Sequence, residues 1–83
     1  MKTEQLYKIY KESTGVVTDS RLVSGGELFF ALRGNNFNGN KYASVALQNG
    51  ASWAVIDDPL YETEKTILVD NCLDELQSLA SYH

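Results

Sequence analysis

An unbroken apolar run near the middle of the chain most constrains its fold. Residues 28–32 read Leu-Phe-Phe-Ala-Leu, so a strand formed here would be apolar on both faces. Such a strand is covered on both sides, as in a parallel or mixed sheet packed between helices. A glycine-containing loop, helical spacing over residues 42–49 and a second apolar run at residues 52–56 follow it. Strand, helix and strand over about thirty residues predict a βαβ unit with parallel strands and a right-handed crossover.

Shorter elements flank this unit. Apolar residues at helical spacing predict an amphipathic helix over residues 3–12, and Val-Val-Thr predicts a brief strand at residues 16–18. A fourth strand is predicted at residues 66–69, followed by a last amphipathic helix. The fold class is therefore α/β: a small three-layer domain with a mixed or mostly parallel sheet of about four strands and helices on both faces.

Capping residues mark the ends of two predicted helices. Asn40 is expected to cap the start of the helix in the βαβ unit, and Gly50 to end it in a left-handed conformation. Asp70 or Asn71 is expected to cap the last helix. That helix keeps its apolar spacing up to the final residues with no Gly or Pro to end it, which favours a chain cut from something longer.

Length and charge exclude several classes of protein. Eighty-three residues, 1–83, suffice for a single domain with one modest core. The net charge of -4 argues against general binding to nucleic acid or to a membrane surface. No apolar run approaches the ~20 residues that cross a bilayer, and the N-terminus does not resemble a signal peptide. With Cys72 as its single cysteine, we expect a soluble cytoplasmic protein without a disulfide.

The loop after the first apolar run nearly matches an ATP-binding loop. Gly34 and Gly39 have the spacing of a Walker A motif, G-x-x-x-x-G-K-S/T. However, Asn40 stands where the lysine is needed, Lys41 comes one residue late, and Tyr42 replaces the hydroxyl residue that holds magnesium. A helix turns by about 100° per residue, so the late lysine would point away from the phosphates. No cofactor is therefore expected in this chain.

Residues suited to catalysis are not combined into a site. The only histidine, His83, is the last residue, and Ser20 has no histidine partner to activate it. Acidic pairs at residues 57–58 and 74–75 are explained by a strand end before proline and by the first turn of a helix. We therefore expect no reaction, and no metal site, from this chain alone.

Two loops are better equipped for binding. Each follows the end of a predicted strand, where ligands bind in α/β sheets. Together they offer hydroxyls, a carboxylate, a guanidinium, amides and an aromatic ring from Thr18, Asp19, Ser20, Arg21, Asn35, Asn36 and Phe37. This set could stack a planar ring and bond its edge, as a nucleobase requires. The same residue types are also ordinary turn formers, and the residues alone do not decide between these readings.

A family resemblance favours the nucleobase. The motifs that carry it are Thr18-Asp19-Ser20-Arg21, then Gly26-Glu27-Leu28-Phe29-Phe30-Ala31-Leu32-x-Gly34, then Asn38-Gly39-Asn40-x-Tyr42, then Ala46 and Gly50-Ala51. In this order and spacing they resemble the N-terminal domain of the Mur ligases, over roughly residues 16–57.

Departures from the family pattern preserve turn, cap or packing roles. Gly25 replaces a proline, Asn38 an aspartate, Asn40 a histidine and Tyr42 a phenylalanine. The Phe-Phe pair within residues 28–32 and the Asn-Gly-Asn variant look more similar to the D-alanyl-D-alanine-adding branch of the family than to the tripeptide-forming branch.

The resemblance implies a role for the two loops. In such ligases the N-terminal domain holds the UDP end of a UDP-N-acetylmuramoyl peptide, the partner expected here. By position, Ser20 would contact the uridine, with Thr18, Asp19 and Arg21 beside it, and residues 35–37 would cradle the uracil. A central domain using ATP and Mg²⁺ and a C-terminal domain would complete a ligase of peptidoglycan precursor synthesis, so this chain alone should be inactive. The alternatives are the tripeptide-forming ligase, or a non-catalytic α/β interaction module whose last helix docks a partner.

Overall fold

The computed structural model describes residues 3–82 and contains a parallel sheet between two helical layers. The sheet has the order β1-β2-β5-β6, and all neighbouring strands are parallel. Its strands are β1 (Val16–Val17), β2 (Leu28–Phe30), β5 (Trp53–Ile56) and β6 (Thr66–Leu68). The predicted α/β fold class is confirmed, and its mostly parallel sheet is here parallel throughout.

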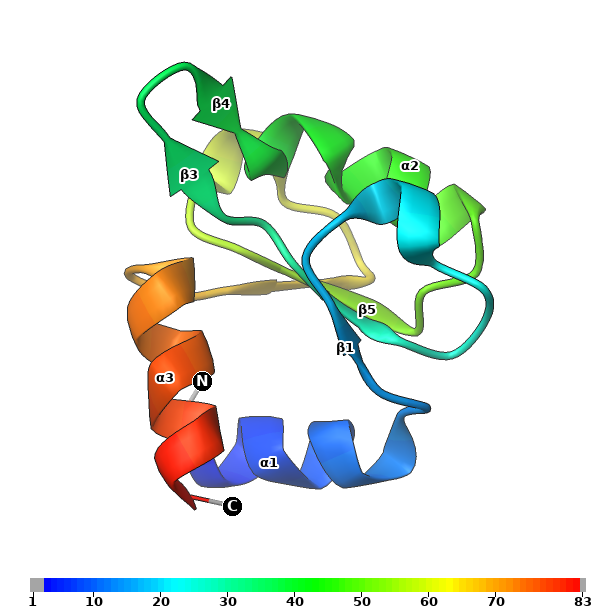
Figure 1. Ribbon diagram of the computed structural model, residues 1–83, viewed down its shortest axis with the longest axis vertical. Helices are drawn as coiled ribbons and strands as arrows, with labels where there is room; N and C mark the ends of the chain where they lie inside the picture. Colours follow the sequence, from blue (N-terminus) through cyan, green and yellow to red (C-terminus); the bar gives the residue numbers. More distant parts are fainter. Residues whose placement is uncertain (1–2, 83) are drawn as a thin grey trace.

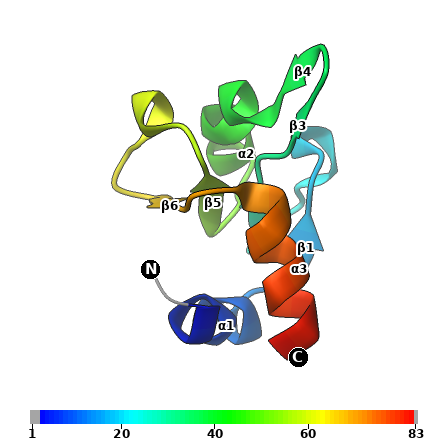
Figure 2. The same ribbon diagram turned by 90° about the vertical axis from the view of Figure 1, so that its left-hand side faces the viewer.

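Helices cover both faces of the sheet. α1 (Thr3–Glu12) and α3 (Cys72–Tyr82) pack against each other on one face, while α2 (Ala43–Gln48) lies on the other (Figure 1). The 3₁₀ helices η1 (Ser20–Leu22), η2 (Gly39–Tyr42) and η3 (Pro59–Tyr61) belong to the α2 side. The same three layers are visible in the perpendicular view (Figure 2). The connections between neighbouring strands therefore run over one face, and α1 and α3 close the other.

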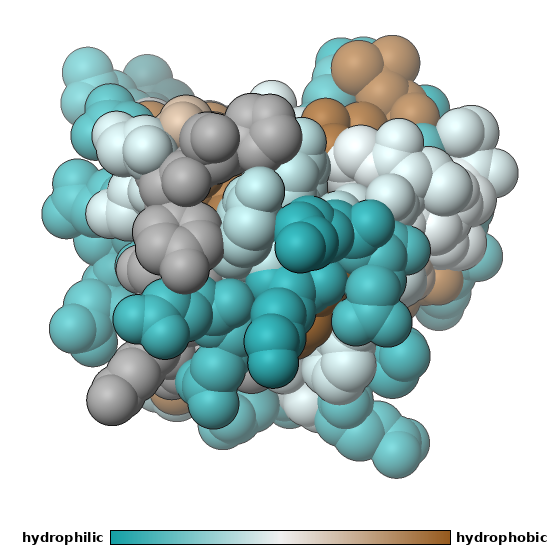
Figure 3. Space-filling view, turned by 90° about the horizontal axis from the view of Figure 1, so that it is seen from below, coloured by the Kyte–Doolittle hydropathy of each residue, from teal (hydrophilic) through white to brown (hydrophobic). Residues whose placement is uncertain are grey.

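The sheet is buried because its central strands are apolar on both faces. In β2, Leu28 and Phe30 are fully buried and Phe29 is 1% exposed, as the apolar run predicts. Leu6 of α1 and Leu79 of α3 complete the core from one side. The face that α1 and α3 present to solvent is mostly hydrophilic (Figure 3), and no helix within residues 3–82 is long and apolar enough to cross a membrane.

A small hairpin that the sequence did not reveal interrupts the path from β2 to α2. β3 (Arg33–Gly34) pairs antiparallel with β4 (Phe37–Asn38), and Asn35 and Asn36 form the turn. Strands of two residues are too short to show an alternating pattern, so the loop looked irregular in the sequence.

The predicted cap of the central helix was wrong. Asn38, not Asn40, caps the helical segment: its side-chain oxygen accepts from the Asn40 amide at 3.1 Å at the start of η2. Asn40 itself is fully buried. The prediction for Gly50 is confirmed, because it follows α2 with φ +110°. Asn71 caps α3 through the Asp74 amide, at 3.0 Å.

Candidate functional site

A hollow of about 450 Å³ opens beside the carboxyl ends of β1 and β2. Because the two strands are parallel, the segments that follow them meet at the same edge of the sheet, as ligand sites in α/β folds require. The hollow is lined by Thr18, Asp19, Ser20, Arg21, Phe29, Phe37 and Tyr42. Two groups of these residues form the η1 wall, residues 18–21, and the aromatic wall, Phe37 and Tyr42.

Ser20 is a largely buried residue that lines this hollow. It begins η1 and is 7% exposed. Its carbonyl oxygen accepts hydrogen bonds from the Val23 amide at 3.5 Å and the Asn49 side chain at 3.3 Å. Its hydroxyl has no hydrogen-bond partner among the residues that the structure describes. A hydroxyl can both donate and accept, so this group is available to a polar edge of a ligand.

Asp19 and Arg21 form a compact ion pair at the rim of the hollow. Asp19 caps η1 by accepting from the Arg21 amide at 2.9 Å, and its carboxylate also accepts from the Arg21 guanidinium at 3.0 and 2.7 Å. The side-chain hydrogen bond from Arg21 is the main cause that lowers the pKa of Asp19 to about 2. The same pair raises the pKa of Arg21. Both charges are thus balanced locally, at the edge of a hollow whose inner lining is uncharged.

The aromatic wall is a stacked pair of rings. Phe37 of β4 and Tyr42 of η2 lie with their centroids 5.5 Å apart and their planes 11° from parallel. Phe37 is 51% and Tyr42 42% exposed, and the buried Phe29 of β2 lines the same hollow. Exposed, mutually oriented rings offer a planar ligand a stacking surface at little ordering cost, since their positions are already fixed.

The structure separates some of the predicted site residues from the others. Asn35 and Asn36 do not line this hollow; they are exposed at the hairpin turn and border a neighbouring hollow of about 270 Å³ that also contains Lys41. Phe37 borders both hollows. Conversely, Phe29 and Tyr42 line the main hollow but were not predicted. The Tyr42 ring, exposed five positions after Phe37, was a signal available in the sequence; Phe29 was hidden within an apolar run.

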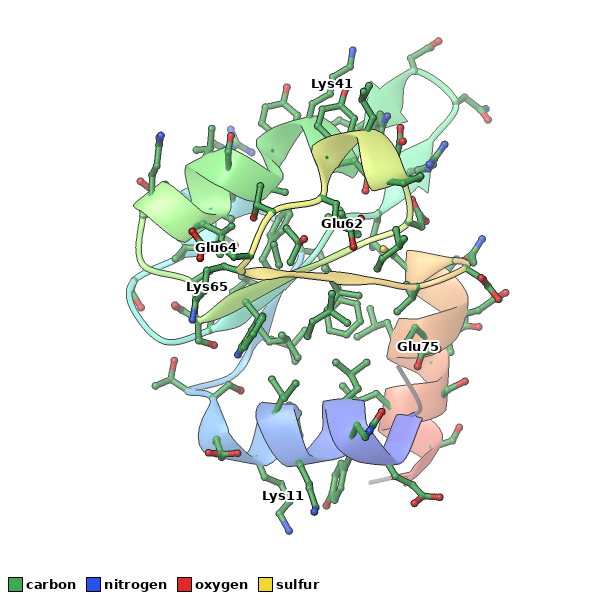
Figure 4. The ribbon with its side chains drawn as sticks, turned by 180° about the vertical axis from the view of Figure 1, so that it is seen from behind. Lys11, Lys41, Glu62, Glu64, Lys65 and Glu75 are labelled. Atoms are coloured by element: carbon green, nitrogen blue, oxygen red, sulfur yellow. The ribbon has the colours of Figure 1, made fainter. Side chains whose placement is uncertain are left out.

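The loop that nearly matches a Walker A motif does not fit nucleotide phosphates. The Gly39 amide donates to the Leu32 carbonyl oxygen at 2.8 Å, and the Asn40 amide donates to Asn38. These amides are therefore unavailable to phosphate oxygens, which a phosphate loop binds through its backbone. Lys41 extends outward from the layer of η2 and α2 (Figure 4). Within residues 3–82 no three His, Cys, Asp or Glu side chains are grouped so that they could hold a metal ion.

Comparison with known proteins identifies a family. The sequence pattern of the family described as "Mur ligase family, catalytic domain" matches residues 12–82. A UDP-N-acetylmuramoyl-L-alanyl-D-glutamate--2,6-diaminopimelate ligase from Rickettsia typhi is 38% identical over 69 residues, which cover 83% of this chain and 13% of that protein. A UDP-N-acetylmuramoyl-tripeptide--D-alanyl-D-alanine ligase from Synechocystis sp. is 39% identical over 69 residues, covering 80% of this chain and 15% of that protein.

Solved structures show the same fold. A MurF ligase from Thermotoga maritima, crystallised in complex with ADP, superposes with a TM-score of 0.76 at 28% identity, over 84% of this chain and 16% of that one. A MurF from Acinetobacter baumannii gives the same TM-score at 22% identity over 96% of this chain, which supports the fold alone. The chain thus spans a small part of the length of the proteins it matches.

Proposed function

This chain belongs to the Mur ligase family, and from that premise we propose that it is the substrate-recognition domain of an ATP-dependent, amide-forming ligase of peptidoglycan precursor synthesis. It binds the UDP part of a UDP-N-acetylmuramoyl peptide, with the uracil ring in the hollow between the η1 wall and the aromatic wall. ATP and Mg²⁺ act in a central domain, and the incoming amino acid or dipeptide binds with the help of a C-terminal domain. The chain by itself recognises substrate and does not catalyse.

One observation carries the proposal: an unpartnered hydroxyl, on a residue that is largely buried, lines the same hollow as two exposed, stacked rings. A hydroxyl that is not bonded to the protein can donate to, or accept from, the polar edge of a ligand. The Ser20 hydroxyl is such a group, and uracil presents alternating donors and acceptors along its edge. The pair Phe37 and Tyr42 supplies the stacking surface for the flat face of the ring.

The lining also explains why a base fits the inner hollow better than a phosphate. Apart from the mutually paired Asp19 and Arg21, the lining residues carry no formal charge. A diphosphate would therefore have to lie outside, towards solvent. At ~0.3 kcal/mol per heavy atom, a uridine of about 17 heavy atoms gains roughly 5 kcal/mol, so the isolated chain should bind with a sub-millimolar Kd at best.

An amide NMR titration with UDP, with ADP as the control ligand, tests the proposal. We expect saturable shifts at Ser20 and Phe37 with UDP and none of comparable size with ADP. Ser20→Ala should weaken UDP binding by about ten-fold, because it removes the hydroxyl while the wall remains. Ser78→Ala, on the exposed side of α3, is the matched control and should bind like the unmodified chain. Equal responses to UDP and ADP would contradict uracil recognition.

The finer proposal is that the parent ligase adds D-alanyl-D-alanine. The Synechocystis relative supports it by its name, while the Rickettsia relative, named as a diaminopimelate ligase, is similar to nearly the same degree. Phosphate release by the full-length ligase distinguishes the two. We expect turnover with D-alanyl-D-alanine and the tripeptide precursor; turnover only with diaminopimelate and the dipeptide precursor would contradict it.

A further inference from the structure

Asn40 is a fully buried amide whose side chain is fully engaged. Its Nδ2 donates to the Asn38 Oδ1 at 2.8 Å and to the Asp57 Oδ1 at 2.8 Å. Its Oδ1 accepts from the Asp57 backbone amide at 3.0 Å. Both donors of the amide are thus used, together with its acceptor oxygen. A buried amide with every group paired fixes its neighbours, because moving any one of them leaves a polar atom without a partner.

Asp57 extends this network to two further parts of the chain. It follows β5, and its carboxylate also accepts from the Arg33 Nε at 2.9 Å and from the Cys72 amide at 3.0 Å. Its side chain is 7% exposed. The carboxylate therefore joins the hairpin strand β3, the helix η2 and the start of α3 at one point beside the end of β5. We call Arg33, Asn38, Asn40, Asp57 and the Cys72 amide the Asp57 network.

The Asp57 network holds the aromatic wall. Asn38 follows Phe37 directly on β4, and Tyr42 is the last residue of η2, two positions after Asn40. Gly39, between the two asparagines, is packed so closely that a Cβ there would lie 2.5 Å from the Leu32 oxygen. Each ring of the stacked pair is thus attached to a segment that the network anchors. The η1 wall depends on other contacts, among them the bond from Asn49 to Ser20.

We propose that Asn40 is a positioning residue for the base-binding hollow. It touches no ligand; through Asp57 it sets the place of the Phe37 and Tyr42 rings relative to Ser20, and so the width of the slot that a pyrimidine enters. The inference rests on the proposed function, because the slot matters only if a base enters it. Asn40 does not line the hollow, yet by this inference it is one of the residues that determine specificity.

The test compares Asn40→Ser with a control of similar cost in stability, Ile67→Ala. Ile67 is buried on β6, at the edge of the sheet opposite β1, so its truncation weakens the core without touching the Asp57 network. Urea unfolding measures the loss of stability in each variant. UDP titration and the nuclear Overhauser contacts between the two rings measure the hollow.

We expect Asn40→Ser to lose the contacts between the rings of Phe37 and Tyr42 and to weaken UDP binding by at least about five-fold more than the control, because binding groups must be held within about 0.5 Å. Arg33→Gln, which changes a half-exposed member of the network and should fold in any case, should shift binding in the same direction by about two-fold. When Asn40→Ser and Arg33→Gln are combined, their effects on UDP binding should be less than additive, since both act through Asp57.

The outcomes separate the two proposals. UDP binding by the unmodified chain, with losses in Asn40→Ser and Arg33→Gln no larger than in Ile67→Ala, would overturn the positioning role alone. Retained ring contacts in Asn40→Ser would overturn it as well. If the unmodified chain binds UDP no better than ADP, the proposed function fails and this inference fails with it.

Discussion

Glu27 and Asp57 are both nearly buried carboxylates, at opposite ends of the sheet, and they hold the chain in different ways. Glu27, just before β2, accepts from the Ser24 amide and hydroxyl and from the Gly25 amide, all within three residues of itself. Asp57, just after β5, accepts from side chains and a backbone amide 15 to 24 positions away. One carboxylate shapes a local turn, whereas the other joins separate segments beside the hollow.

This difference predicts how far from each carboxylate the structural effect of a substitution should extend. A local turn can rearrange without moving its surroundings, so the effect of changing Glu27 should stay within residues 24–27. The partners of Asp57 cannot find substitutes locally, because they belong to different elements. Loss of that carboxylate should reach both the stability of the chain and the shape of the hollow.

The largest expected effect is that of Asp57→Ala. Removing the carboxylate takes away one partner of the buried Asn40 side-chain NH₂ and the partner of the Cys72 amide, which should lower the free energy of unfolding by about 3 kcal/mol. Urea unfolding measures this value, and UDP titration should show weaker binding. Asp58→Ala is the matched control. Asp58 caps η3 through the Leu60 amide, so we expect a loss of about 1 kcal/mol in the free energy of unfolding and unchanged UDP binding. Equal losses of stability and of UDP binding in the two variants would contradict the conclusion that Asp57 joins separate segments beside the hollow.

Gly39→Ala tests the same corner of the fold by crowding it. A Cβ at this position would lie 2.5 Å from the Leu32 oxygen and 2.8 Å from the Leu32 nitrogen, so the backbone must shift. We expect about 2 kcal/mol of lost stability, as for other overpacked sites, with amide shifts centred on residues 32–42. Gly34→Ala is the control, since its nearest contact would be an ordinary 3.8 Å from Phe37. A cost for Gly34→Ala as large as that for Gly39→Ala would rule out crowding as the cause.

Glu27→Gln should have a smaller, pH-dependent effect. Hydrogen bonds from the Ser24 amide, the Gly25 amide and the Ser24 hydroxyl lower the pKa of Glu27 from 4.5 to about 2. The carboxylate thus stabilises the fold above pH 4.5, and this contribution is lost as the pH falls from 4.5 towards 2. When the free energy of unfolding is measured from pH 7 to pH 2, it should fall less steeply below pH 4.5 in the variant than in the unmodified chain. UDP binding at pH 7 should be unchanged; a loss there would show that the turn is not isolated.

The smallest effect is expected for Asp19→Asn. Asp19 is paired with Arg21, whose side chain is 86% exposed, and exposed ion pairs contribute little to stability. Asparagine is also a good helix cap, so it can still accept from the Arg21 amide. Urea unfolding should not distinguish this variant from the unmodified chain. A clear loss of stability would mean that η1 depends on the charge of Asp19. The η1 wall would then rely on a charge contact, as the aromatic wall relies on Asp57.

The sheet could be predicted from the sequence because its strands are apolar. A run buried on both faces, a helix and a second apolar run leave few arrangements besides a parallel βαβ unit. The first helix was predicted with the bounds that the structure shows, residues 3–12, since its apolar spacing is regular. Gly50 could be identified as a helix end because a left-handed residue there favours glycine.

The arrangement of the asparagines could not be predicted. Asn38 and Asn40 are both suitable caps by residue type, and only the fold decides that Asn38 caps η2 while Asn40 turns inward to Asp57. The same limit applies to the hollow: Asn35 and Asn36 precede Phe37 directly, yet the hairpin turns them towards another hollow. Local sequence indicates which polar groups are available, and tertiary structure decides which of them meet.

The burial of Cys72 gives the chain an internal reporter of local opening. It is the single cysteine, it begins α3, and its thiol is fully buried and donates to the Val55 carbonyl oxygen at 3.3 Å. Burial is the main cause that raises the pKa of this thiol to about 12, so it stays protonated and unreactive while the junction is closed. An alkylating reagent can therefore label the chain only when the start of α3 separates from β5. The labelling rate would measure how often this junction opens in the otherwise folded protein, without any engineered probe.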